Sequence, residues 1–318
     1  MLAKSPFHGG EQAAQARIGM RDKIEQTGRR IVHDAMSDEH REFFEDLPFI
    51  VVGSADADGA PWASLLSGEP GFVRAPSSKR LVVQAVPLPR DPLARSLLPG
   101  SPLGLLGIEL STRRRNRENG RIRRVEGGSF ELEVEQSFGN CKQYIQARAG
   151  TFAPASSCAP PSVESSALSS EAFGVLAGTD TTFIATASRE PTRGGAEGVD
   201  VSHRGGRPGF IRSERSGAGT RLTLPDFSGN FMFNTFGNLE VNPRAGLLAL
   251  DFDSGVVLSL TGTARVIWDG PAVAELEGAE RLLEFQVRSG LLWRGVLLGW
   301  SAPELSPHLR RTGTWPKR

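Results

Sequence analysis

Short apolar runs separated by glycine, proline and acidic turns recur along the chain, and they predict a protein built mainly of β-strands. Strands are predicted in the first half at residues 49–54, 63–66, 81–86, 103–110 and 121–125. They are predicted in the second half at residues 183–187, 198–202, 221–224, 246–251 and 256–267. Five or six short strands per half are typical of a small closed or nearly closed barrel.

A repeat links the two halves of the chain. The sequence GEPGFVR at residues 68–74 recurs as GRPGFIR at residues 206–212, with five of seven residues identical. Residues 47–53 resemble residues 181–187, and residues 104–108 resemble residues 246–250. The spacing between matched segments drifts by a few residues, as insertions in loops would cause. One β unit is therefore predicted to occur twice.

Helix signals precede and follow these units. Ser37 and Ser170 each stand before acidic residues, as helix N-caps do. Residues 10–32 predict a helical segment that rests on the barrels with one face. Short helical stretches are also predicted within residues 136–148 and 272–288.

A stretch rich in Ala, Ser and Pro at residues 150–168 lacks apolar periodicity and is interpreted as a linker. The predicted organisation is an N-terminal helical segment (1–36), a first barrel (37–149), the linker (150–168) and a second barrel with a C-terminal helical segment (169–318).

The amino-acid composition limits the kinds of partner that the protein is expected to bind. The 318 residues include 37 Lys and Arg against 36 Asp and Glu, so the net charge of +1 creates no field that attracts nucleic acid or anionic membrane. No apolar run approaches the roughly 20 residues of a membrane helix, and no export signal is evident at the N-terminus. A cytoplasmic protein without a nucleic-acid or membrane partner is expected, with Cys141 and Cys158 as free thiols.

Several classes of catalytic site are excluded. The five histidines are scattered, without an HExxH motif or Cys/His ligand spacing, so no metal is expected. No G-x-S-x-G elbow occurs, and the glycine-rich stretches follow neither the Rossmann nor the P-loop order.

Polar and glycine residues are concentrated in the second unit, at residues 202–210, 222–230 and 233–238. Glycine admits a ligand to backbone N–H groups, arginine and hydroxyl groups suit phosphate, and amides suit the edge of a heterocycle. The combination favours a phosphorylated heterocycle. The alternative is that these are only turn residues of a β protein.

An arginine-rich run at residues 112–124 has three interpretations: a nucleic-acid stripe, a contact for an anionic cofactor, or a solvated edge strand whose charges block pairing. The run lacks aromatic residues, which argues against binding of single strands by stacking. The repeat matches it to residues 255–266, so it belongs to a barrel rather than to a tail.

Together these stretches resemble bacterial flavin-nucleotide-binding proteins related to pyridoxamine 5′-phosphate oxidase. The resemblance covers nearly the whole chain, and it is specific as an ensemble although each motif alone is weak. The segments that carry it are residues 6–11, 59–64, 104–110, 112–117, 138–146, 203–206 and 225–238. It implies two tandem FMN-binding split β-barrels, with FMN at a barrel–barrel interface that a dimer usually forms. Here one chain could supply both barrels, and a homodimer stays open as an alternative.

The oxidase pattern is only partly present. Its phosphate-gripping serine and lysine match Ser228 and Asn230, so the lysine is missing and arginines must supply the charge. The substrate-binding signature of the oxidase is unrecognisable, and vitamin B6 oxidation is not inherited. The residues expected to bind cofactor are His203, Arg204, Gly205, Gly206, Arg212, Pro225, Asp226, Ser228, Asn230, Asn234, Asn238, Arg265, Arg113, Arg114, Arg115, Asn116 and Arg117.

The expected function is binding of FMN, with FAD as an alternative, in a flavin-dependent oxidoreductase whose substrate and electron donor the sequence does not name. No residue stands out as an acid, base or nucleophile. The alternatives are a non-enzymatic flavin carrier or redox sensor, and a split barrel that binds haem or a deazaflavin. Residues 84–91 of the first unit lack the polar set of the second, so one flavin per chain is expected.

Overall fold

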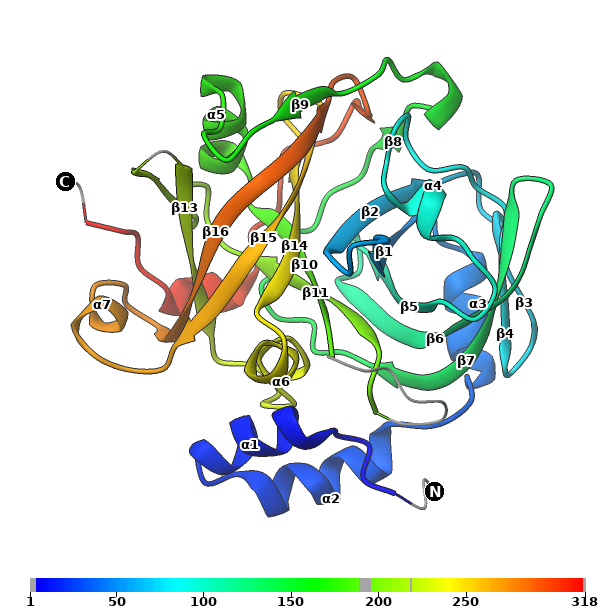
Figure 1. Cartoon of the computed structure of the whole chain (residues 1–318), viewed down its shortest axis with the longest axis horizontal. Helices are drawn as coiled ribbons and strands as arrows, with labels where there is room; N and C mark the ends of the chain where they lie inside the picture. Colours follow the sequence, from blue (N-terminus) through cyan, green and yellow to red (C-terminus); the bar gives the residue numbers. More distant parts are fainter. Residues whose placement is uncertain (1–3, 189–195, 218, 317–318) are drawn as a thin grey trace.

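The computed structural model describes residues 4–188, 196–217 and 219–316. It is mainly β, with two large antiparallel sheets and short helices at the periphery (Figure 1).

The first sheet has seven strands in the order β2-β1-β5-β6-β7-β4-β3. Helix α3 (Asp38–Glu45) precedes the sheet, and α4 (Leu93–Ser96) follows β4. The strands are β1 (Phe49–Ala55), β2 (Pro61–Ser67), β3 (Val73–Ser77), β4 (Arg80–Val83), β5 (Pro102–Glu109), β6 (Arg114–Glu126) and β7 (Ser129–Gly139).

The second sheet has the order β11-β10-β14-β15-β16-β13-β12. Its strands are β10 (Thr181–Ala187), β11 (Val199–Gly205), β12 (Arg212–Ser216), β13 (Gly219–Phe227), β14 (Arg244–Asp251), β15 (Val256–Ile267) and β16 (Ala279–Trp293). Its helices are α5 (Ser170–Gly178), α6 (Asn234–Val241) and α7 (Pro271–Ala274).

The two sheets have the same topology strand for strand, so the repeat detected in the sequence is also a repeat of topology. The registers place Phe49 of β1 opposite Ser67, and Thr181 of β10 opposite Gly205. Phe49 therefore corresponds to Thr181, a shift of two residues from the match seen in the sequence. Among the described strands, the two ends of each sheet do not pair with each other, so neither sheet closes by hydrogen bonds.

Four apolar clusters hold the fold together: one lies within each unit, a third joins the two sheets, and a smaller fourth packs the N-terminal segment against Phe138 and Met232. The shared cluster includes Phe49 and Val51 from β1 and Phe183 and Val201 from the second sheet, all at most 1% exposed. Because these side chains are buried as fully as those inside each unit, the junction between the sheets excludes water as a domain core does. Burial of apolar surface stabilises the folded state by about 25 cal/mol per Å², so the two sheets form one body.

Two glycines in equivalent positions let the sheets approach. A Cβ on Gly104 of β5 would lie 2.5 Å from the carbonyl oxygen of Val199, and one on Gly246 of β14 would lie 2.6 Å from that of Pro61. Only glycine fits where the backbones come this close.

The helix caps follow the predicted chemistry with one correction. The Ser37 hydroxyl accepts a hydrogen bond from the backbone N–H of His40 at the start of α3. The second cap is Ser169, whose hydroxyl accepts from Ala172 N–H, and not the predicted Ser170.

The N-terminal segment forms two helices, α1 (Gly9–Arg17) and α2 (Arg21–Ile31), separated at Gly19, which has a φ of +70°. Figure 1 shows them side by side below α6, and α1 contacts α6 directly. The segment therefore packs on the second unit near the start of α6.

Residues of the predicted linker and of the C-terminus tie the units together. Strand β8 (Thr151–Phe152) pairs with β17 (Leu297–Leu298), and β9 (Ser162–Glu164) adds to β16. Short 3₁₀ turns form at Ala155–Ser157 and Pro307–Arg311.

Three predictions about elements were wrong. Within residues 272–288 the helix is limited to the short α7, and from Ala279 the chain continues as strand β16. Every second side chain of this part of β16, Leu283, Phe285 and Val287, lies in the apolar core of the second unit. Residues 136–148 continue β7 to Gly139 and then run without a helix. The arginine run is not an edge strand, since β6 pairs with both β5 and β7.

None of the helices in the described ranges is long and apolar enough to cross a membrane. Cys141 and Cys158 are free thiols, as expected.

Candidate functional site

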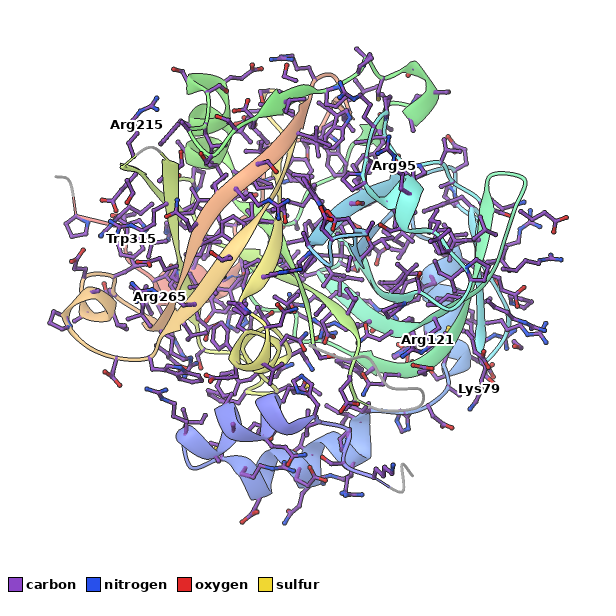
Figure 2. The ribbon with its side chains drawn as sticks, in the orientation of Figure 1. Lys79, Arg95, Arg121, Arg215, Arg265 and Trp315 are labelled. Atoms are coloured by element: carbon purple, nitrogen blue, oxygen red, sulfur yellow. The ribbon has the colours of Figure 1, made fainter. Side chains whose placement is uncertain are left out.

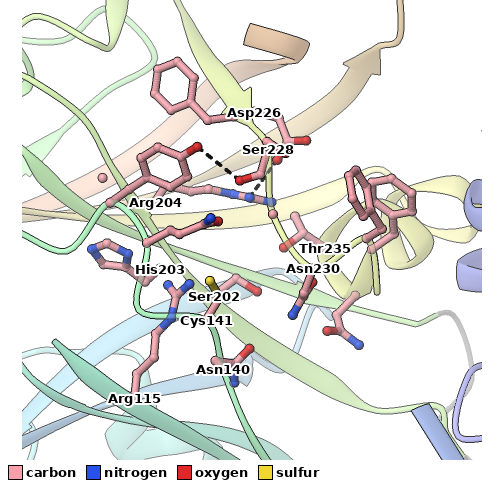
Figure 3. A pocket seen from close by; sticks show the side chains of 18 of the residues that line it. Arg115, Asn140, Cys141, Ser202, His203, Arg204, Asp226, Ser228, Asn230 and Thr235 are labelled. Atoms are coloured by element: carbon pink, nitrogen blue, oxygen red, sulfur yellow. Dashed lines mark hydrogen bonds and ion pairs between the residues drawn. The ribbon is translucent and has the colours of Figure 1, made fainter. Parts of the chain in front are cut away.

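A cleft lies where the two units meet, between β6 of the first sheet, β11 and the end of β13 of the second, and the start of α6 (Figure 3). The segment after β7, residues 140–144, forms its remaining wall. Its volume is about 100 Å³.

Two arginines of β6 face the cleft, because residues two apart on a strand point to the same side. The Arg117 guanidinium binds Asp200 at 3.1 Å, Ser202 at 2.6 Å and Asn234 at 2.9 Å. Arg115 has no ion pair among the described residues, and its buried Nε has no hydrogen-bond partner there. Burial, together with Arg117 and Arg204, lowers the pKa of Arg115 to about 10, although the neighbouring Cys141 opposes the shift. Arg115 is thus a buried cation without a carboxylate partner among the described residues.

Two further arginines share one carboxylate at the opposite wall. Arg204 and Arg281 each donate to Asp226 at 2.8 Å, one to each oxygen. The Arg204 guanidinium also lies over the Phe236 ring, and that of Arg281 lies over Phe233. Asp226 therefore holds two guanidinium groups in place and is not available as a base.

His203 lines the cleft with an exposed fraction of 5%, and neither ring nitrogen has a partner among the described groups. Burial, with the nearby charges of Arg115 and Arg204, lowers the pKa of His203 well below its ordinary value. The ring is therefore neutral at pH 7. It offers one donor and one acceptor to whatever enters the cleft.

The start of α6 closes one end of the cleft. Phe231 and Phe233 have φ values of 57° and 61°, a left-handed conformation that a large side chain rarely adopts. No side chain caps the helix at Phe233, and a helix start without a cap leaves its first N–H groups available to other acceptors. The hydroxyl of Thr235, 2% exposed, is likewise without a partner in the described structure. Such a terminus suits an anion.

The segment after β7 was missed as a site by sequence reasoning. Tyr144 has a φ of 62°, its hydroxyl donates to the Ser228 carbonyl oxygen at 3.1 Å, and its ring packs on Phe227. The amide nitrogen of Asn140 and the amide oxygen of Gln143 are buried without partners in the described chain. These residues lie in the stretch 138–146 that carried the family resemblance, which was the available signal.

The structure brings many of the expected cofactor residues to this cleft. Those that line it are His203, Arg204, Gly205, Pro225, Asp226, Ser228, Asn230, Asn234, Arg115 and Arg117. Ser228 and Asn230 lie at its exposed rim, where the Asn230 side-chain oxygen accepts from Met232 N–H at 3.1 Å.

Other expected residues lie elsewhere. Arg265 is exposed on β15 and pairs with Glu284 at 2.8 Å; Figure 2 shows it on the opposite side of the molecule from Arg121 of β6. Arg212 pairs with Glu275 and stacks on Trp315.

The start of the arginine run also misses the cleft. Arg113 binds Glu304 and the Ile145 carbonyl oxygen, and Arg114 binds Glu39. Arg114 points to the face of β6 opposite Arg115 and Arg117, since side chains alternate along a strand. Arg113 precedes the first residue of the strand. Three more expected residues do not line the cleft. Gly206 packs under Phe210, Asn116 is buried on β6, and Asn238 is buried behind the cleft.

The equivalent groove of the first unit is filled. The registers match Arg117 to Ser259 and Arg204 to Leu66. Leu88, which follows β4, is 4% exposed within the shared apolar cluster, and the indole of Trp293 donates to the Pro89 carbonyl oxygen at 2.9 Å. The polar cleft thus exists once, with an apolar counterpart in the other unit.

No protein-family model and no curated protein matches the chain. Among solved structures, one from Lactobacillus delbrueckii described as a "putative pyridoxamine 5′-phosphate oxidase" is 13% identical, with 42% of this chain and 98% of that chain covered and a TM-score of 0.31. HutZ, described as the heme storage protein from Vibrio cholerae, is 11% identical, with 45% and 99% covered and a TM-score of 0.24. PhuS, a heme-binding protein from Pseudomonas aeruginosa, is 9% identical, with 89% and 94% covered and a TM-score of 0.20. At these TM-scores the likenesses decide nothing about the ligand of this chain, which has to be argued from its own residues.

Proposed function

We propose that the cleft binds the phosphate of a planar phosphorylated cofactor, FMN, and that the protein is a flavin-dependent oxidoreductase. The observation that carries the proposal is Arg115, an unpaired guanidinium in a cleft that already holds three other arginines.

The charge around the cleft favours an anion. Arg117 is balanced by Asp200, whereas Arg204 and Arg281 meet at Asp226, with Glu280 also beside Arg281. Of the four guanidinium groups that line the cleft, that of Arg115 is the one without a carboxylate partner among the described residues. An unpaired charge in a desolvated site is costly, and a phosphate that accepts charge-assisted hydrogen bonds from it removes that cost.

The other unsatisfied groups suit the same ligand. Thr235 and the uncapped start of α6 offer donors to phosphate oxygens. His203, Asn140 and Gln143 offer donors and acceptors to a heterocycle edge. The rings of Tyr144, Phe231 and Phe233 line the cleft and supply flat apolar surface.

The size of the cleft limits how much of the ligand is enclosed. Its 100 Å³ is well below the roughly 300–1,000 Å³ of pockets that enclose a drug-sized molecule. The phosphate and its neighbouring atoms fit within it, and the rest of a flavin extends past the Ser228–Asn230 rim. A bound flavin supplies the hydride and electron transfer, while these residues bind and orient it.

A second candidate ligand is haem, and the observation that favours it is His203. A buried neutral imidazole with a free ring nitrogen is the form in which histidine ligates iron. The polar walls and the small enclosed volume favour the flavin phosphate over a porphyrin.

The test is the visible spectrum of the purified protein, followed by mass spectrometry of the molecule released on denaturation. Two flavin bands and the mass of FMN support the proposal, and the mass of FAD corrects the nucleotide. A sharp Soret band overturns it in favour of haem. Turnover of NAD(P)H with an electron acceptor then separates an oxidoreductase from a flavin carrier.

A further inference from the structure

We propose that the N-terminal helix α1 is a working part of the cleft, in which Glu11 is a positioning residue that fixes Arg117 through Asn234 and so sets ligand affinity. This inference rests on the proposed function of the cleft.

Helix α1 docks on α6 through backbone contact. A Cβ on Gly10 would lie 2.1 Å from the Gly237 carbonyl oxygen, and one on Gly237 would lie 2.5 Å from the Glu11 backbone. Two glycines therefore let the helices touch at the level of the main chain. That contact carries Glu11 to within hydrogen-bond reach of the first turn of α6.

Three polar side chains at the start of α1 point into the second unit. The Glu11 carboxylate accepts from Asn234 Nδ2 with one oxygen and from His8 N–H at 2.9 Å with the other. The Gln15 amide donates to the Met232 carbonyl oxygen at 3.0 Å, and His8 Nε2 lies 2.9 Å from Asn238 Oδ1. All three are at most 6% exposed. These contacts hold the loop and helix that close the cleft.

The direction of each hydrogen bond follows from the donors that face Glu11. Asn234 Nδ2 donates to one carboxylate oxygen and His8 N–H donates to the other. Burial and the nearby Asp200 raise the pKa of Glu11 well above its ordinary value, and these two hydrogen bonds oppose the rise. The Asn234 oxygen then faces the cleft wall, where it accepts from Arg117 at 2.9 Å. Gln at position 11 has one acceptor oxygen for these two donors, so its NH2 group must face either His8 N–H or Asn234 Nδ2. The contact that orients the Asn234 oxygen toward Arg117 is then weakened.

The experiment compares wild type, Glu11→Gln and the matched control Glu25→Gln. Glu25 lies on α2 in the same N-terminal segment and pairs with Arg21 and Arg29, away from α6. In apo protein, the ¹⁵N–¹H signal of the Arg117 Nε, assigned by its absence in Arg117→Lys, reports guanidinium order. Binding is measured by titration with FMN, and thermal unfolding reports stability.

We expect Glu11→Gln to broaden the Arg117 signal and to weaken FMN binding at least tenfold, with a melting temperature close to that of wild type. Glu25→Gln should match wild type in both the signal and the affinity. Gly237→Ala changes no polar side chain but pushes α1 away from α6, so it should reproduce the Glu11→Gln result. It provides the same test if Glu11→Gln does not fold.

An unchanged Arg117 signal in Glu11→Gln overturns the inference, as does FMN binding equal to that of wild type. Equal losses of affinity and stability in the Glu11 and Glu25 variants would also overturn it, since they indicate a general structural role. If wild type itself fails to bind FMN while the Arg117 signal still responds to Glu11, the proposed function fails, and the contact chain from Glu11 to Arg117 stands without a role in FMN binding.

Discussion

Arg115 is a cation held in a desolvated wall near the Cys141 thiol, without a carboxylate partner among the described residues. Such a group lowers stability until a ligand neutralises it. We expect Arg115→Gln to keep or raise the melting temperature and to weaken FMN binding more than tenfold, since a charge-assisted hydrogen bond contributes about 1.5–3 kcal/mol. Differential scanning calorimetry and fluorescence titration measure the two effects.

The control for that variant is Arg265→Gln. Arg265 was expected to supply charge to the phosphate, but it is exposed and paired with Glu284. Its replacement should leave FMN affinity at the wild-type value. A loss in Arg265→Gln, or no loss in Arg115→Gln, would place the anion elsewhere.

Asn230 at the rim of the cleft gives a second prediction at the residue scale. Asn230→Asp places a negative charge beside the proposed phosphate position and should weaken FMN binding more than tenfold. The matched change is Gln84→Glu, an exposed amide in the equivalent loop of the first unit. A titration in which the two variants bind alike would contradict the assignment.

Sequence reasoning at this scale grouped residues that the fold does bring together. Residues from 202–205 and 225–235 line one cleft, and their binding of a ligand stays a prediction. Burial could not be read in the same way: residues 84–91 were expected only to lack the polar set, yet Leu88 among them is 4% exposed in the shared core. A charge at Leu88 would damage the fold, so this position is no control for binding. Glu11 was also missed, because its partner Asn234 lies far away in sequence.

At the scale of elements, strand β6 carries a buried acid on the face away from the cleft. Glu118 is fully buried beside His40 of α3, at 3.3 Å, and accepts from Ser137 of β7. Burial raises the pKa of Glu118 from 4.5 to about 7, although the His40 and Ser137 contacts oppose the rise. The folded state therefore holds this proton over a pH range in which the unfolded chain has lost it.

The sign of the pH effect follows. Glu118 contributes stability that is fully present below about pH 4.5 and is lost as the pH rises toward 7. We expect Glu118→Gln, which does not titrate, to gain on wild type by up to about 3 kcal/mol between these pH values. Urea unfolding of both proteins at several pH values checks this, and a difference that is constant with pH would contradict it.

Element types were predictable from the sequence only where period and turn signals agree. The strands before GEPGFVR and GRPGFIR, β2 and β11, were found, whereas the short strands after them, β3 and β12, were not predicted. Strand β16 was read as a helix, because Leu276, Leu282 and Leu283 fit helical spacing as well. This segment is a strand because it pairs with β13 and β15, and such tertiary pairing cannot be seen in the local sequence.

At the scale of the whole molecule, the two grooves have diverged. The polar cleft of the second unit has an equivalent in the first that is filled by Leu88 and closed against Trp293. We expect one FMN per chain in isothermal titration calorimetry. A stoichiometry of two would show that the apolar groove also opens to ligand.

The sequence repeat predicted the identical strand orders, but it did not predict how the units are joined. The shared apolar cluster, the Gly104 and Gly246 approaches and the β8–β17 pair all join residues distant in sequence. None leaves a periodic signal within either unit. Even the two-residue shift between Phe49 and Thr181 could be read only from hydrogen-bond registers.

Joining both sheets in one polypeptide has a consequence for how such a protein can change. In a symmetric pair of separate chains, every substitution appears in both grooves, so a mutation that fills one site destroys the other. Here each groove is encoded separately. One groove can therefore hold hydrophobic groups such as Leu88 that contribute to the shared core, while the other holds the unpaired guanidinium of Arg115. In the fused chain, one half can thus contribute stability while the other half provides the polar cleft, whereas a symmetric dimer needs a single sequence that does both.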